Sequence, residues 1–340
     1  MSARLWIILL FLASPCAMAD SPQQMAAIGD LPLVSGETLH DVQLGYRTAG
    51  TLNADRSNVI VFPTWFTGSS EDLLRNDKIG PGKLADTDRY FVIAVDALGN
   101  GISTSPSNSE RQPGADFPPI QIDDMVNAAH ALVTRHLGID HVHAVMGISM
   151  GGMQTFQWLG QYPEFMDKAV PLDGTPQQTA YDLLVWQAHE QAIELLQAKG
   201  ADKAEIMGLI DSLGLLTLWT PDWFVANVPP ERLAAFRAEN ASGEEPMDPH
   251  DYLAQLRAML AHDAYADFAA AEGGYPGRIA AEVLVVGVPG DHLVNPAPGK
   301  ALAEAIGARY AEIQSNCGHI GTSCEAWQVE AIVNAFLQEN

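Results

Sequence analysis

A serine at position 149 has neighbours that could make it a nucleophile. It lies in the pattern G-x-S-x-G (147–151), after an apolar run at 143–146 and before a helical pattern at 153–159. A sharp turn between a strand and a helix raises such a serine above a sheet, and small neighbours avoid clashes in the turn. An ordinary glycine-rich turn is the alternative. The context favours Ser149 as the nucleophile of an acyl-transfer reaction.

A serine hydroxyl needs a base to remove its proton and an acid to orient that base. His319 follows the last expected strand, and Asp291 follows the strand before it. The order serine, acid, histidine along the chain is the order found in α/β hydrolases. Asp173 also ends an expected strand and stays open as an alternative acid. We favour Asp291, and expect it to meet Ser149 and His319 at one edge of a sheet.

The oxygen that becomes negative during acyl transfer needs hydrogen-bond donors. The backbone N–H of Met150, directly after the nucleophile, is one expected donor. The second should come from the turn after the expected strand at 58–64, where we favour Phe66 and keep Trp65 as the alternative. The sequence contains no cluster with metal-ligand spacing, so we expect neither a metal nor a cofactor.

The elements that must position these residues alternate between extended apolar runs and helical patterns. Strands are expected at 42–48, 58–64, 90–96, 143–148, 168–172, 281–288 and 310–314, and helices at 123–137, 299–305 and from about 324. The run at 59–62 is apolar at every position, which indicates a central strand covered on both faces. The pattern predicts an α/β-hydrolase fold, with a mostly parallel central sheet and helices on both faces.

One long segment interrupts this rhythm. Residues 175–274 contain no convincing strand and are rich in Ala, Leu, Gln, Glu and Met. We interpret them as a helical cap inserted into a core formed by 20–174 and 275–340. Histidines within the cap, such as His189, are expected to be solvated or structural. Because open α/β sheets bind ligands at their carboxyl edge, we expect a small-molecule acyl ester to bind beneath the cap.

The first 19 residues have the features of a signal peptide. Arg4 is followed by a short apolar stretch at 5–13, and Ala17-Met18-Ala19 is a small-residue cleavage pattern. An uncleaved membrane anchor is the alternative. No later apolar run is long enough to span a bilayer. We therefore expect a periplasmic or secreted protein without a membrane span after cleavage.

Export also affects how the cysteines and the charge are interpreted. Removal of the signal leaves Cys317 and Cys324, and an oxidising compartment permits a disulfide between them. Two buried thiols are the alternative. The formal net charge of −24 repels polyanions, which argues against nucleic acid as a partner.

Several segments, in order along the chain, resemble the homoserine O-acetyltransferase family. They are YRTAGTLN (46–53), IGPGKLADTDRYFVIAVD (79–96), STSPSN (103–108), FPPIQIDDMVNAAHALVTRHLGI (117–139), GISMGGMQTFQW (147–158), DHLVNP (291–296) and Gly318-His319. Together they are far more specific than G-x-S-x-G alone. The resemblance implies a helical cap and triad roles for Ser149, Asp291 and His319. Related proteins often pair through their caps, so it also suggests a homodimer.

Departures from the family bear on the substrate. Family members that act on homoserine carry a basic cap residue for its carboxylate, whereas 186–193 contains neither Arg nor Lys. The oxyanion segment TWFTG (64–68) is bulkier than the family's HALTG-like segment. Export would also separate the protein from acetyl-CoA, a cytoplasmic donor. We therefore favour an exported carboxylic ester hydrolase, with an O-acyltransferase using an acyl-CoA donor and a non-catalytic binding protein as alternatives.

Overall fold

The computed structural model describes residues 21–241 and 246–339, so the predicted signal peptide lies outside the described residues. The main sheet is built from β1 (Gln24–Pro32), β2 (Thr38–Ala49), β3 (Val59–Pro63), β6 (Phe91–Val95), β7 (Val142–Ile148), β8 (Met166–Leu172), β9 (Glu282–Gly287) and β10 (Arg309–Glu312). Their order across the sheet is β1-β2-β6-β3-β7-β8-β9-β10. β1 and β2, and β2 and β6, pair antiparallel, and the other neighbours pair parallel.

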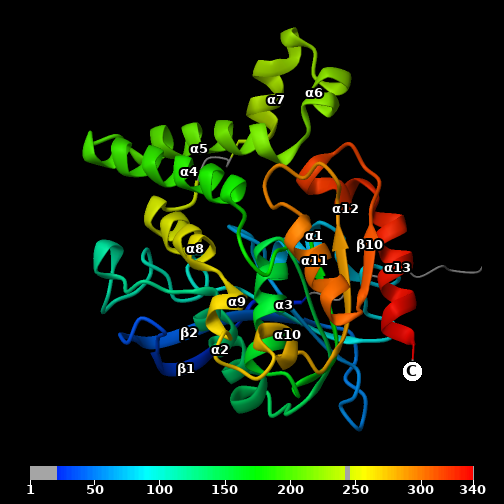
Figure 1. The fold of residues 1–340 in the computed structure, drawn as a ribbon. Coiled ribbons are helices and arrows are strands. Elements are labelled where there is room, and N and C mark those ends of the chain that lie inside the picture. Colours follow the sequence, from blue (N-terminus) through cyan, green and yellow to red (C-terminus); the bar gives the residue numbers. More distant parts are fainter. Residues whose placement is uncertain (1–20, 242–245, 340) are drawn as a thin grey trace, which may run out of the picture.

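Helices cover both faces of this sheet (Figure 1). In β3, Val59 and Val61 belong to one hydrophobic core, whereas Ile60 and Phe62 belong to another, because successive side chains point to opposite faces. The first core includes residues of α2 (Ile122–Ala131), α3 (Met150–Gln161) and α11 (Ala297–Ile306). The second includes residues of α1 (Ser70–Arg75) and α13 (Ala326–Gln338). The predicted α/β-hydrolase fold is confirmed.

Two local features differ from the sequence prediction. The strand β1 was not expected, because its sequence contains Gly29 and lacks a regular alternation of apolar residues; it forms an edge strand with register shifts on both sides of that glycine. The single helix expected over 123–137 ends as an α-helix at Ala131 and continues as a π-helical turn, Leu132–His136. A short parallel pair, β4 (Ile79–Gly80) and β5 (Ala85–Asp86), forms a second small sheet.

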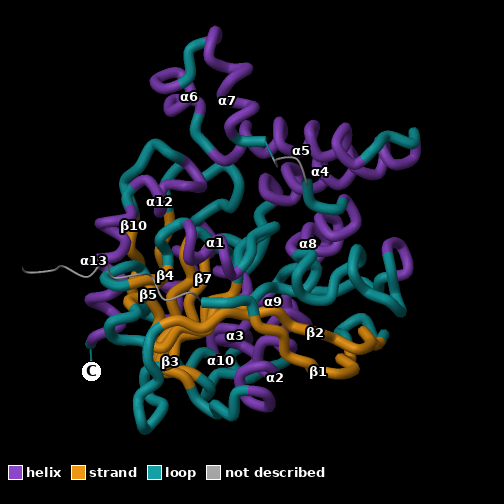
Figure 2. The backbone as a smooth tube through the Cα atoms, turned by 180° about the vertical axis from the view of Figure 1, so that it is seen from behind, coloured by secondary structure: helices purple, strands orange, loops and turns teal. Residues whose placement is uncertain are grey.

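Between β8 and β9 the chain forms a helical insertion, and Figure 2 shows its helices α4 to α7 above the sheet. Its helices are α4 (Ala180–Ala198), α5 (Lys203–Leu218), α6 (Pro221–Asn227), α7 (Leu233–Glu239), α8 (Pro249–Ala261), α9 (Ala264–Asp267) and α10 (Gly274–Arg278). Capping boxes begin α4 at Thr179 and α5 at Asp202, because each side chain accepts a bond from the N–H three residues ahead. In the described part of the chain, no helix is both long and apolar enough to cross a membrane.

The two ends of this insertion differ in what they contact. α4 and α5 pack against each other and lie apart from the sheet (Figures 1 and 2). The segment around α9 and α10 instead packs on the core helix α3. The hydroxyl of Tyr275 donates a 2.5 Å hydrogen bond to the carbonyl oxygen of Phe156, and the ring of Phe268 lies against Gly160. These contacts return the chain to the sheet, where β9 begins.

Candidate active site

Ser149 occupies the tight turn between β7 and α3. Its φ of 59° lies in the left-handed region, where a residue other than glycine is strained. The turn also requires small neighbours. A Cβ on Gly147 would lie 2.3 Å from the carbonyl oxygen of Gly151, and a Cβ on Gly151 would lie 2.6 Å from that of Pro63. This strand–turn–helix arrangement has the geometry of a nucleophile elbow.

Three side chains that are distant in sequence meet at this turn. The Nε2 atom of His319 lies 2.9 Å from the Oγ of Ser149, and its Nδ1 lies 2.7 Å from the Oδ2 of Asp291. All three residues are buried. Asp291 follows β9, and His319 follows β10 in a short 3-10 turn (Gly318–Ile320). The geometry is that of a Ser–His–Asp triad.

The surroundings of Asp291 determine how it acts on His319. Its Oδ1 accepts hydrogen bonds from the N–H groups of Leu293 (2.8 Å) and Val294 (3.0 Å), which leaves Oδ2 for the imidazole. Burial alone would lower the pKa of His319. The charge and hydrogen bond of Asp291, with contributions from two other aspartates, outweigh burial and raise that pKa. The imidazole is therefore suited to holding a proton taken from the serine.

Asp173, the alternative acid, has different partners. Its Oδ2 accepts a 2.6 Å hydrogen bond from Thr322, and its Oδ1 is buried without a hydrogen-bond partner among the described residues. Burial raises the pKa of Asp173 to about 7, so its carboxyl is partly protonated near neutral pH. The carboxylate that hydrogen-bonds to His319 is that of Asp291.

The predicted oxyanion donors are the backbone N–H of the residue after Ser149 and that of a residue lining the same cavity. Met150 is the first residue of α3, so its N–H has no carbonyl partner within the helix. Phe66 and Trp65 both line the cavity that contains Ser149. The next N–H along the chain, that of Thr67, donates to a side-chain oxygen of Gln255 at 2.9 Å. Oxyanion stabilisation by Met150 and Phe66 therefore stays a prediction, with Trp65 as the alternative.

A cavity of about 650 Å³ lies between the triad and the cap. Its cap side is lined mainly by apolar and aromatic residues, namely Trp186, Ile210, Leu215, Leu218 and Tyr252. The helix α4, which contributes to this wall, contains neither Lys nor Arg over 180–198. Among residues 21–241 and 246–339, no group of three His, Cys, Asp or Glu side chains could hold a metal ion.

His189 is a polar residue of this wall, and from the sequence we expected it to be solvated or structural. Its Nδ1 lies 2.8 Å from the hydroxyl of Tyr252, and its ring packs edge-on against Trp186 at a centroid distance of 5.6 Å. The ring of Phe66 contacts both Tyr252 and Trp186, at 4.6 and 5.6 Å. Burial lowers the pKa of His189 to about 4, so this imidazole is neutral at pH 7. No sequence motif links these four positions.

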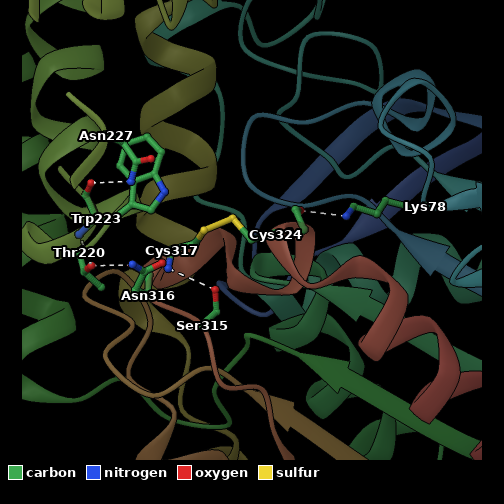
Figure 3. Close-up of a disulfide and its surroundings, with 9 residues drawn as sticks. Lys78, Thr220, Trp223, Asn227, Ser315, Asn316, Cys317 and Cys324 are labelled. Carbon is green, nitrogen blue, oxygen red and sulfur yellow. Dashed lines mark hydrogen bonds between the residues drawn. A yellow bond between two sulfur atoms is a disulfide. The ribbon is translucent and has the colours of Figure 1, made fainter. Parts of the chain in front are cut away.

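A disulfide joins Cys317 and Cys324 (Figure 3), which flank His319 in the sequence. The Cα atoms of the two cysteines are 6.6 Å apart. Directly before this segment, the carbonyl oxygen of Asn316 accepts a 2.5 Å hydrogen bond from Thr220, the residue that caps α6. The segment that carries the triad histidine is therefore covalently closed and also bonded to the cap.

The chain is similar to known α/β hydrolases in sequence and structure. A family model for the alpha/beta hydrolase fold matches residues 58–203. A homoserine O-acetyltransferase of Methanosphaerula palustris is 30% identical over 90% of this chain and 71% of its own length. An ethyl acetate hydrolase of Pseudomonas veronii is 36% identical over 60% of this chain. An acetylester hydrolase from Corynebacterium glutamicum has a similar solved structure (TM-score 0.85, 26% identity, 94% of this chain and 96% of that chain).

The sequence matches differ in extent. The matches to two esterase relatives, each 36% identical, cover only 51% and 60% of those proteins' own lengths. The match to the O-acetyltransferase of M. palustris, in contrast, spans nearly the whole chain. This long match agrees with the family resemblance seen in the sequence, with the fold and with the geometry of the turn at Ser149. The chain belongs to the homoserine O-acetyltransferase-like family of α/β-hydrolase-fold enzymes.

Proposed function

We propose that the protein is an exported serine esterase that hydrolyses small carboxylic esters through an acyl-enzyme intermediate on Ser149. The observation that carries this proposal is the buried hydrogen-bonded series Ser149–His319–Asp291, which borders a cavity whose cap side is mainly apolar and aromatic. Relatives named as an ethyl acetate hydrolase and an acetylester hydrolase support hydrolysis as the reaction.

In the first half-reaction, the Oγ of Ser149 attacks the carbonyl carbon of the ester while His319 Nε2 removes the hydroxyl proton. Asp291 accepts the Nδ1–H bond and stabilises the imidazolium that forms. The N–H groups of Met150 and Phe66 donate to the carbonyl oxygen as it becomes negative. The tetrahedral intermediate then collapses, and the alcohol leaves with the proton from His319.

In the second half-reaction, a water molecule replaces the alcohol. His319, now neutral, removes a proton from this water as its oxygen attacks the acyl carbon. The second tetrahedral intermediate releases the carboxylic acid, and the proton on His319 returns to the Oγ of Ser149. The enzyme is then in its starting state, and no external cofactor takes part.

The residues of the cap favour water over an amino-acid acceptor. On the cap side of the cavity, the carboxylate of homoserine would meet no basic side chain of α4, and His189 is neutral at pH 7. The basic residues that line the cavity, Lys78 and Lys83, belong to the core. A second candidate function is O-acyl transfer, in which a substrate hydroxyl takes the place of water. Relatives named homoserine O-acetyltransferase, at 30% identity over 90% of the chain, favour this second candidate.

A substrate panel with Ser149→Ala as the inactive reference separates these two functions. We expect turnover of p-nitrophenyl acetate and ethyl acetate by the wild-type protein, with loss of turnover in the variant. Failure of a fluorophosphonate probe to label Ser149 would refute the acyl-enzyme. Release of thiol from acetyl-CoA that required homoserine and outran ester hydrolysis would favour the transferase.

We also propose that the protein is periplasmic or secreted. The signal-like residues 1–19 and the Cys317–Cys324 disulfide support this location, because disulfides persist mainly in oxidising compartments. Cell fractionation with N-terminal sequencing of the mature chain tests it. Recovery of the protein from the cytoplasm with residues 1–19 intact would contradict export.

A homodimer that pairs through the cap is the final part of the proposal. Large apolar side chains are exposed on α4, α5 and α6, and the most exposed are Leu184, Leu216 and Val225. Pairing through the cap would bury these exposed apolar side chains against a partner. Light scattering after size exclusion should give twice the chain mass, and Leu216→Asp should shift the protein toward the monomer. A wild-type monomer at micromolar concentration would contradict pairing.

A further inference from the structure

The segment from Cys317 to Cys324 carries more of the site than the triad histidine. It forms the 3-10 turn Gly318–Ile320 and the short helix α12 (Gly321–Cys324), and the disulfide joins its first residue to its last (Figure 3). The base of the triad, His319, lies two residues after the first cysteine. Anything that changes the conformation of this segment therefore changes the position of the imidazole relative to Ser149.

Side chains near the end of the segment bind two buried groups of the core. The hydroxyl of Thr322 donates to Asp173 at 2.6 Å, and the ammonium of Lys78 donates to the Oγ of Ser323 at 2.9 Å (the latter bond is drawn in Figure 3). Asp173 and Lys78 are both at least nine-tenths buried. These bonds fix α12, at the far end of the segment from His319.

The beginning of the segment is packed tightly, and its hydrogen bonds run to groups nearer the surface. The N–H of Cys317 donates to the Oγ of Ser315 at 3.2 Å, next to the bond from Thr220 to Asn316. Gly318 has a φ of 69°, and a Cβ there would lie 2.9 Å from the carbonyl oxygen of Leu218. The hydrogen bonds of His319 itself run to the triad partners, so they cannot also fix the segment independently of catalysis. The disulfide ties this beginning to α12, which is bonded to the buried side chains of Asp173 and Lys78.

We propose that the Cys317–Cys324 disulfide positions His319 against Ser149, so that opening the bond slows acyl transfer while the core stays folded. A bridge over six intervening residues restrains the unfolded chain less than a longer loop would, because the entropic effect of a disulfide grows with loop length. Its main effect should therefore be local. The proposal rests on the proposed function, because it assumes that His319 acts as the base.

The chemistry of opening is thiol–disulfide exchange with a dithiol. Cys324 is exposed and Cys317 is buried, so a thiolate of the reagent attacks the sulfur of Cys324 and Cys317 leaves as a thiolate. The second thiol of the reagent attacks the mixed disulfide and releases Cys324. The protein gains two electrons and two protons, and the reagent is oxidised to a cyclic disulfide.

The experiment compares the wild-type protein before and after treatment with dithiothreitol, which is removed by gel filtration before a pH-stat assay with ethyl acetate. We expect kcat to fall by about 5- to 50-fold with KM changed less than about twofold, because misplacing a catalytic group by 1 Å costs up to about 10²-fold. Air reoxidation should restore the rate. Cys317→Ser/Cys324→Ser should have the lowered rate from the start and be insensitive to the reagent.

Two further readouts distinguish positioning from a general loss of stability. Circular dichroism should show that the reduced protein is folded at the assay temperature. The acidic limb of the kcat/KM profile should move toward pH 6.5, because a looser contact with Asp291 removes the interaction that raises the pKa of His319. If the double variant does not fold, the reduced wild-type protein carries the same test.

The outcomes separate this inference from the proposed function. Equal kcat values and equal pH profiles for the bridged and the reduced protein, with both states verified by mass spectrometry, would overturn the inference and leave the esterase proposal intact. If the wild-type protein hydrolyses no ester but reacts with a fluorophosphonate at Ser149, the labelling rate replaces kcat in the comparison. A wild-type protein that does neither would refute the proposed function and the inference with it.

Discussion

Two buried histidines line the same cavity and differ in what surrounds them. His319 lies between the hydroxyl of Ser149 and the carboxylate of Asp291, and its pKa is raised. His189 lies among aromatic rings of the cap beside the hydroxyl of Tyr252, and burial lowers its pKa to about 4. Burial alone thus keeps an imidazole neutral. A carboxylate partner is what allows a buried imidazole to accept a proton at neutral pH.

The largest effect on kcat is expected from removing the two imidazoles in turn. His319→Ala should lower kcat for ethyl acetate by roughly 10³- to 10⁵-fold, because the serine then has no base. His189→Ala, the matched control in the same cavity, should lower kcat by less than about tenfold, because no proton passes through it. The double variant Ser149→Ala/His319→Ala should be no slower than Ser149→Ala alone. Comparable losses for the two histidines would invalidate the distinction between them.

The next comparison concerns the two aspartates that could orient His319. Asp291→Asn should lower kcat by roughly 10²- to 10⁴-fold, because the amide no longer stabilises the imidazolium. Asp173→Asn keeps an acceptor for Thr322 and should lower kcat by less than about tenfold. Both rates can be measured on the same ester at pH 8. A greater loss in Asp173→Asn would reassign the acid.

The pH dependence of turnover tests the raised pKa of His319. The base must be neutral, so kcat/KM should be constant at high pH and fall by about tenfold per pH unit below the pKa of the imidazole. Because the pKa of His319 is raised, the midpoint should lie above 6.5. The carboxyl of Asp173, with a pKa of about 7, titrates in the same range, so the profile of Asp173→Asn serves as the control. A wild-type midpoint below 6 would contradict the assignment.

The triad could be predicted from sequence because each member follows the end of a strand. Ser149 is fixed by its glycine neighbours, and Asp291 and His319 follow the two last strands of the sheet. Parallel strands bring their carboxyl ends to one edge, so local patterns are enough to predict a meeting in space. Asp173 satisfies the same local criterion, and the two aspartates are distinguished by their partners in space, because His319 bonds to Asp291 whereas Thr322 bonds to Asp173.

The cap wall could not be predicted in the same way. His189 and Tyr252 lie on α4 and α8, 63 residues apart, and their hydrogen bond depends on how two helices pack. Helix packing has no short sequence signature comparable to a strand end, so a histidine on α4 gives no sign of the cavity it lines. The edge strand β1 was missed for a related reason. Its pairing with β2 compensates for a sequence that contains a glycine and does not alternate.

The smallest expected effect concerns the pH dependence of stability in the cap. His189 has a pKa of about 4 when folded and about 6.5 when unfolded, so the unfolded chain binds more protons between these values. The contribution of His189 to the free energy of unfolding is complete above pH 6.5 and is lost as the pH falls toward 4. The loss between pH 7 and pH 5 is about 2 kcal/mol. In urea unfolding, the free energy of unfolding should therefore decrease less between pH 7 and pH 5 in His189→Leu than in the wild type.

The control for this last measurement is Tyr252→Phe, which removes the same hydrogen bond but keeps the imidazole. Both variants should be destabilised at pH 7 by about 1–2 kcal/mol, because each leaves a buried polar group without its partner. Only His189→Leu should then lose the additional acid sensitivity, since Tyr252→Phe retains the group that titrates. Equal pH slopes in the two variants would mean that the pKa of His189 is the same in the folded and the unfolded protein, and the contrast with His319 would then depend on position within the cavity rather than on charge.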